Sequence, residues 1–77
     1  MSPDKLAHMA NQIAAFFARE PHETAVDAVA DHLVKFWDPR MRAKIIEHYA
    51  EGGAGLDPLV KDAVAKLAKA AKHAPGH

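Results

Sequence analysis

Six histidines offer the most versatile chemistry in this 77-residue chain, because imidazole binds metal ions and titrates near neutral pH. Two histidines that share a metal on one helix face stand four residues apart. His73 and His77 have this spacing, but their helix would have to cross Pro75 and Gly76. The other four lie on different predicted helices or opposite the apolar arc of their own helix: His8, His22, His32 and His48. Since the chain has no cysteine, thiolate ligands are also excluded, and the sequence predicts surface histidines and no metal site.

Side chains that could carry out catalysis are scarce. The only hydroxyl groups belong to Ser2, Thr24 and Tyr49, and two of these stand at expected helix starts. Four carboxylates cluster at the front of a predicted helix, where the helix dipole favours them: Glu20, Glu23, Asp27 and Asp31. An active site needs a nucleophile or an acid–base pair held in a pocket, and no other group converges on these acids. We therefore expect no catalytic residue.

The stretch "GGAGLDP", residues 52–58, is rich in glycine and precedes a predicted helix, which is also the setting of phosphate-binding loops. It lacks the lysine and Ser/Thr of a P-loop, and no strand precedes it. We interpret it as a connector between helices in which glycines take positive φ, with Gly52 ending the preceding helix. Leu56 is expected to pack, because an apolar residue just before a cap often contacts the first turns of the helix.

Helix starts are marked by a cap residue followed by proline, and this pair occurs at Ser2-Pro3, Asp38-Pro39 and Asp57-Pro58. With a fourth start at residues 22–24, after Pro21, the helices are expected at about 3–19, 23–36, 39–51 and 58–72. No segment alternates with period two. The sequence predicts an all-α fold, a small compact bundle of four short helices joined by turns that contain proline or glycine. Residues 1–72 are expected to form a single domain, followed by a flexible tail at 73–77.

The apolar residues of the first two helices form arcs that should face the core. Leu6, Met9, Ile13, Phe16 and Phe17 make the first arc, and Val26, Val29, Leu33, Phe36 and Trp37 make the second.

Charge and hydropathy exclude several classes of protein. Ten basic and ten acidic side chains give a net charge of zero, which argues against a protein whose main function is to bind nucleic acid or an anionic membrane. The longest apolar run, residues 13–18, is too short to span a bilayer, and the first ten residues do not resemble a secretory signal, so a cytoplasmic location is expected. Four lysines on residues 58–72 keep a small helical nucleic-acid-binding or general protein-interaction module as the alternative: Lys61, Lys66, Lys69 and Lys72.

The stretch "FWDPRMR", residues 36–42, places two arginines just after a helix start. There the dipole disfavours each cation by about 0.3–1 kcal/mol, and Arg40 also stands four residues from Lys44. Two interpretations remain open. The arginines pair with nearby acids such as Glu47, while Phe36 and Trp37 close the core, or they meet carboxylates of a partner protein. The second interpretation predicts that Arg40→Ala with Arg42→Ala releases the partner and leaves melting nearly unchanged.

With these segments in view, the sequence resembles the δ subunit of NAD-dependent molybdenum formate dehydrogenases. The resemblance covers roughly residues 2–67 and depends on three blocks in this order and at this spacing: "KLAHMANQIAAFF", "VADHLVKFWDPRMR" and "GGAGLDPLVKDAV".

The resemblance implies a non-catalytic accessory subunit that binds the large catalytic (alpha) subunit of a cytoplasmic complex and supports its assembly, stability or cofactor maturation. The molybdenum bis-guanine dinucleotide, the iron–sulfur clusters and FMN would be carried by other subunits, with no cofactor on this chain. The block "FWDPRMR" then marks the expected partner contact, and the aromatic pair of the first helix with the glycine-rich loop is expected as a secondary contact. These residues are Phe36, Trp37, Arg40, Met41 and Arg42 for the first contact, and Phe16, Phe17, Gly53, Gly55 and Leu56 for the second.

Overall fold

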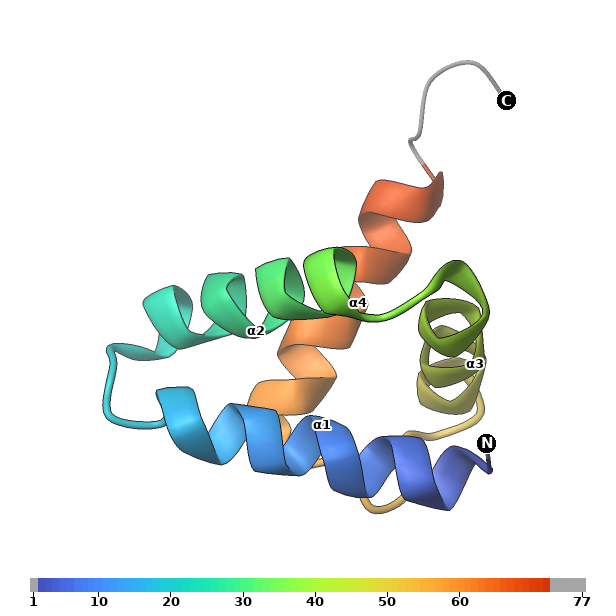
Figure 1. The fold of residues 1–77 in the computed structure, drawn as a ribbon, viewed down its shortest axis with the longest axis horizontal. Coiled ribbons are helices and arrows are strands. Elements are labelled where there is room, and N and C mark those ends of the chain that lie inside the picture. Colours follow the sequence, from blue (N-terminus) through green and yellow to red (C-terminus); the bar gives the residue numbers. More distant parts are fainter. Residues whose placement is uncertain (1, 73–77) are drawn as a thin grey trace.

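The computed structural model describes residues 2–72, which form four helices and no strand. The helices are α1 (Pro3–Phe17), α2 (His22–Phe36), α3 (Pro39–Ala50) and α4 (Pro58–Lys72), as Figure 1 shows. The prediction of an all-α bundle of four short helices is confirmed. The predicted flexible tail, residues 73–77, lies outside the described residues.

Side-chain caps begin two of the helices as expected. The Ser2 hydroxyl accepts a hydrogen bond from the Lys5 N–H at 3.3 Å, and the Asp38 carboxylate accepts one from the Met41 N–H at 2.9 Å. Helix α2 begins without a side-chain cap, directly after Pro21. The helix ends differ by one or two residues from the prediction, since α1 stops at Phe17 and α3 at Ala50.

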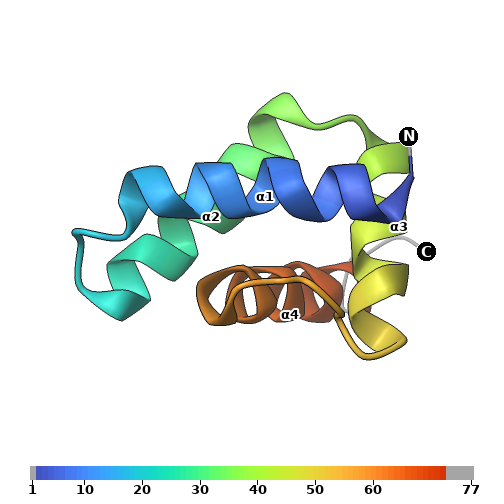
Figure 2. The same ribbon diagram turned by 90° about the horizontal axis from the view of Figure 1, so that it is seen from below.

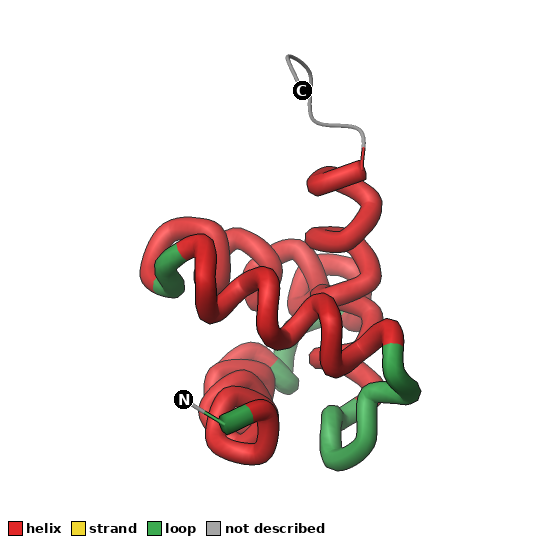
Figure 3. The backbone as a smooth tube through the Cα atoms, turned by 90° about the vertical axis from the view of Figure 1, so that its right-hand side faces the viewer, coloured by secondary structure: helices red, strands yellow, loops and turns green. Residues whose placement is uncertain are grey.

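The helices α1 and α2 form a hairpin, and α4 crosses this hairpin on one side (Figures 1 and 2). Helix α3 lies across the open end of the hairpin and contacts α1 and α4. The helices take several directions rather than running parallel, and the loops lie at the rim of the bundle (Figure 3).

The core lies where α4 meets the other three helices. Its largest fully buried side chains come from every helix: Leu6, Val29, Leu33, Ile45, Val60 and Val64. Buried alanines at positions 7, 10, 14, 30 and 63 let the helix backbones approach closely. All described side chains of this core are apolar, and no buried polar group needs a partner.

Two of the four aromatic residues on the apolar arcs of α1 and α2 lie outside the core. Phe16 is 81% exposed and Phe36 is 72% exposed, whereas Trp37 is only 5% exposed and Phe17 is partly buried. Phe16 and Phe36 are exposed because α4 covers only one side of the α1–α2 hairpin and leaves the outer edge of both apolar arcs open.

The glycine-rich stretch is a connector between helices, as predicted. The Gly53 N–H donates to the His48 carbonyl at 3.0 Å and the Gly52 N–H donates to the Tyr49 carbonyl at 3.0 Å, which is the hydrogen-bond pattern of a Schellman motif. Gly52 and Gly53 have φ values of 120° and 66°. Leu56 is 6% exposed and belongs to the core, which confirms that it packs.

Asn11 fastens this connector to α1 and was not singled out by the sequence analysis. Its amide nitrogen donates to the Gly55 carbonyl at 2.8 Å, and its amide oxygen accepts from the Asp57 N–H at 3.0 Å. Both contacts bridge more than 40 positions of the chain, so they hold the entrance of α4 against α1.

We expect Asn11→Ala to lower the free energy of unfolding by about 1–2 kcal/mol, because two hydrogen bonds are lost in a partly exposed place where water can replace them. Urea denaturation followed by circular dichroism measures this change. The neighbouring variant Gln12→Ala is the control and should change stability by less than about 0.5 kcal/mol. Equal losses in both variants would contradict the role given to Asn11.

Candidate functional site

An open groove of about 630 Å³ runs along α1 beside the end of α2, and we call it the aromatic groove. It is lined by apolar and aromatic side chains with one amide and one imidazole: Met9, Gln12, Ile13, Phe16, Phe17, His32, Phe36, Trp37 and Met41. The α1 residues recur at helical spacing and form a stripe on one face of that helix. No carboxylate, lysine or arginine belongs to the lining.

Ring contacts fix the edges of the aromatic groove. Phe16 and Phe17 meet edge to face, with ring centroids 5.2 Å apart and an interplanar angle of 83°. The rings of His32 and Phe36 lie 4.6 Å apart on α2, one helical turn from each other. Such pairs contribute about 0.5–1.5 kcal/mol beyond burial. The two most exposed aromatic rings of the described residues are therefore each held by a neighbour.

Trp37 and Met41 link the aromatic groove to the rest of the molecule. Trp37 is buried and belongs to the core, so it forms part of the groove wall rather than projecting into solvent. Met41 is half-buried and also lines an adjoining hollow on α3, beside Arg40 and Lys44. The apolar surface thus continues into the start of α3.

Arg42 has an internal role that the sequence analysis did not anticipate. Its guanidinium donates to the Val34 carbonyl at 3.1 Å and also to the Trp37 carbonyl, so it holds the last turn of α2. The dipole of α2 places negative charge at this end, and hydrogen bonds from a charged donor are worth about 1.5–3 kcal/mol. This gain exceeds the cost of a cation near the start of α3. Arg42 thus bonds to backbone carbonyls and forms no ion pair with an acid of residues 2–72, and we expect its removal to lower the melting temperature.

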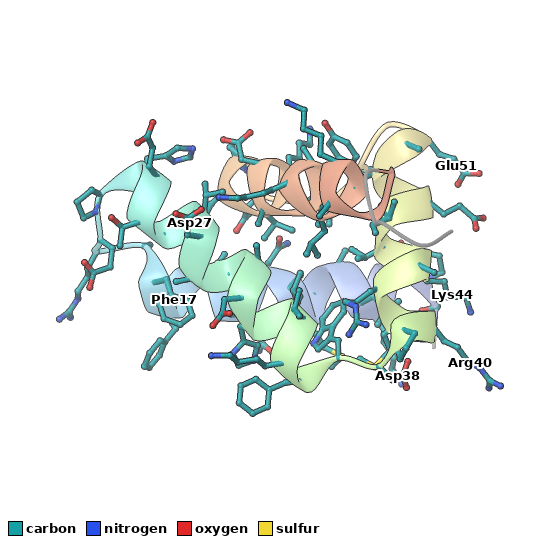
Figure 4. All side chains as sticks on the ribbon, turned by 90° about the horizontal axis from the view of Figure 1, so that it is seen from above. Phe17, Asp27, Asp38, Arg40, Lys44 and Glu51 are labelled. Atoms are coloured by element: carbon teal, nitrogen blue, oxygen red, sulfur yellow. The ribbon has the colours of Figure 1, made fainter. Side chains whose placement is uncertain are left out.

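Arg40 has a different environment. It is exposed, its side chain points away from the bundle in Figure 4, and it forms no ion pair within residues 2–72. Asp38, the acid nearest to Arg40 in sequence, caps α3, and Glu47 lines the same hollow as Arg40 without forming an ion pair with it. Arg40 is therefore available to a carboxylate from outside the domain.

The structure brings part of the predicted site together. Phe36, Trp37 and Met41, from the primary contact, join Phe16 and Phe17, from the secondary one, in one groove. The predicted loop residues lie elsewhere: Gly53 and Leu56 are buried, and Gly55 is held by Asn11. The other lining residues were missed as site residues: Met9, Gln12, Ile13 and His32. Their spacing from Phe16 and Phe36 by three, four or seven positions was the signal that could have found them.

One of the lysines of α4 is engaged within the bundle. Lys66 pairs with Asp27 of α2, and Asp62 pairs with His22 at 2.6 Å, so this side of α4 is occupied by contacts with α2.

The histidines of residues 2–72 are not gathered into a metal site. His48 bonds to the Ala54 carbonyl at 2.6 Å. Among the described residues, no group of three His, Asp or Glu side chains is arranged to hold a metal ion.

The fold and the groove define a small all-helical domain with an exposed aromatic surface. Its sequence matches the family model of the NADH-dependent formate dehydrogenase delta subunit, FdsD, over residues 5–64. The chain belongs to this family, which is a family of subunits of the formate dehydrogenase complex. The matched residues include the aromatic groove and the start of α4.

No curated protein and no solved structure matches the chain. Within residues 2–72, none of the helices has both the length and the apolar character needed to cross a bilayer.

Proposed function

We propose that this chain is a non-catalytic accessory subunit that binds the large molybdenum-containing catalytic subunit of a cytoplasmic NAD-dependent formate dehydrogenase. In this role it supports the assembly, stability or cofactor maturation of that subunit. The observation that carries the proposal is the aromatic groove, where Phe16 and Phe36 are 81% and 72% exposed. Large aromatic side chains dominate binding energy when a partner covers them, and contiguous exposed apolar surface marks interaction sites.

The proposal assigns the redox chemistry to other subunits. The molybdenum bis-guanine dinucleotide, the iron–sulfur clusters and FMN belong to them, and the absence of cysteine means that this chain offers no thiolate to a cluster. The hydroxyls and acids that could serve catalysis are engaged in structure or scattered. Ser2 and Asp38 are helix caps, Asp27 and Asp31 form ion pairs with lysines, and Asp62 bonds to the His22 ring.

The proposal predicts that Phe16→Asp with Phe36→Asp removes the chain from the complex. Burying a carboxylate against an apolar partner surface is costly, and each aromatic anchor of an interface is worth about 2 kcal/mol or more. We therefore expect the affinity to fall by at least about 30-fold. Co-purification of the catalytic subunit with the affinity-tagged variant from the native cell measures the loss.

A matched control is Val34→Asp, which changes a 53% exposed residue of α2 that lies outside the aromatic groove. This variant should co-purify like the wild-type chain, and all three substitutions should preserve the helical circular dichroism spectrum. Full retention of the catalytic subunit by the double variant would show that the aromatic groove is not the docking surface.

A further inference from the structure

The occupant of the aromatic groove can be characterised by the shape of the groove. The α1 stripe from Met9 to Phe17 covers about 12 Å of helix axis, or roughly two turns. Its other wall is the end of α2, so the groove lies between two helices, and Met41 of α3 belongs to its lining. A third helix that packs its apolar ridge between α1 and α2 fits such a groove.

Other kinds of occupant fit less well. A small molecule buried in the groove would leave the outer rings of Phe16 and Phe36 in water, because these stand at its exposed edges. Addition of a peptide strand requires a free sheet edge, and residues 2–72 contain no strand. Proline-rich peptides dock on exposed aromatic faces, whereas the indole of Trp37 is only 5% exposed.

The edges of the groove are also fixed before a partner arrives. Phe36 is held by the His32 ring, and the turn of α2 that carries Phe36 is held by the Arg42 guanidinium. Phe16 is held by Phe17. Because these rings are already ordered, binding loses little side-chain entropy.

The charge at the α3 end of the groove specifies one more property of the occupant. Arg40 forms no ion pair with the described residues, and the guanidinium of Arg42 donates to the backbone carbonyls of Val34 and Trp37. Arg40 lines the hollow that adjoins the groove at Met41, so one guanidinium group stands near this end without a paired carboxylate from residues 2–72. Figure 4 shows Arg40 projecting from α3 into solvent. Complementarity requires a negative charge on the partner at this place.

We propose, resting on the proposed function, that the aromatic groove receives an amphipathic helix of the partner subunit of about two turns. Large apolar side chains of that helix lie between Phe16 and Phe36, and an Asp or Glu at its end next to α3 pairs with Arg40. Arg42 is a positioning residue that keeps the Phe36 edge in place.

The test uses the assembled complex that contains Phe36→p-benzoylphenylalanine, an aromatic photo-crosslinker that preserves the shape of the edge. We expect a cross-link to one segment of the partner that has apolar residues at helical spacing and an acidic residue next to them. The same substitution at Val34, on α2 but outside the groove, should cross-link at least about tenfold less. A complex that contains the chain but gives no cross-link from position 36, or a segment without this pattern, overturns the inference and leaves the proposed function standing. Absence of the chain from the complex overturns both.

The charge is tested separately with Arg40→Glu, and Lys69→Glu on α4 is the matched control. Arg40→Glu should weaken the affinity for the partner by about tenfold or more and should not lower the melting temperature, because an acid near the start of α3 is favoured by the dipole. Lys69→Glu should leave the affinity within about twofold. Unchanged affinity of Arg40→Glu, or an equal loss in both variants, overturns the pairing with a carboxylate.

Discussion

Trp37→Ala is expected to lower the free energy of unfolding by about 3–5 kcal/mol. Trp37 is 5% exposed and packs against the core, so its removal leaves a large cavity between α2 and its neighbours. A domain of this size has a total stability of roughly 4–12 kcal/mol, and the variant should therefore be largely unfolded at elevated temperature. Urea denaturation followed by far-ultraviolet circular dichroism measures the loss. If the loss equals the whole stability of the domain, the variant is unfolded even without urea.

The control is the adjacent aromatic residue. Phe36→Ala removes a ring that is 72% exposed and contacts His32, so the expected loss of stability is about 1 kcal/mol or less. The two neighbours should thus differ several-fold in their effect on the free energy of unfolding. Equal destabilisation by both variants would mean that Phe36 belongs to the core after all.

The starts of the helices could be predicted because their signals are local. Ser2-Pro3 and Asp38-Pro39 combine an acceptor for the free N–H groups with a residue that suits the first helical turn, and both caps form. The turn at Gly52 and Gly53 could be predicted for the same reason, since positive φ is a property of the residue type. None of these features depends on where another helix lies.

The exposure of Phe16 and Phe36 could not be predicted from the apolar arcs. An apolar arc shows which face of a helix is apolar. How much of that face is buried depends on how many other helices pack against it. Here α4 fills one side of the α1–α2 hairpin, so Leu6 and Leu33 are buried while the outer rings are not. The candidate site consists of the part of the apolar pattern that the bundle does not cover.

The contacts of Asn11 and Arg42 could not be predicted either, because each connects segments that only the fold brings together. The Asn11 amide bonds to residues 55 and 57, far along the chain. The Arg42 guanidinium turns back across Asp38 and Pro39 to the end of α2. Within α3 the charge of Arg42 is only unfavourable, because it opposes the helix dipole. Its stabilising effect comes from the hydrogen bonds to the end of the preceding helix, α2.

Arg42→Ala is accordingly expected to lower the free energy of unfolding by about 1.5–3 kcal/mol, because the carbonyls of Val34 and Trp37 lose a charged donor at the end of α2. For a domain of this length, each kcal/mol corresponds to a shift of about 4–8 °C in melting temperature, so thermal denaturation resolves the effect clearly. The loss should also loosen the turn that carries Phe36, and weaker binding to the partner should accompany it.

Arg40→Ala is the matched control, since it removes the same kind of side chain two positions away on the same helix. Arg40 is exposed and forms no ion pair with the described residues, and its charge opposes the dipole of α3. Its removal should leave stability unchanged or raise it by up to about 1 kcal/mol, while binding to the partner is weakened. The pair of variants therefore separates the two arginines by their effect on melting, with Arg42 holding the helix end and Arg40 meeting the partner. Equal melting temperatures for the two variants would contradict the internal role of Arg42.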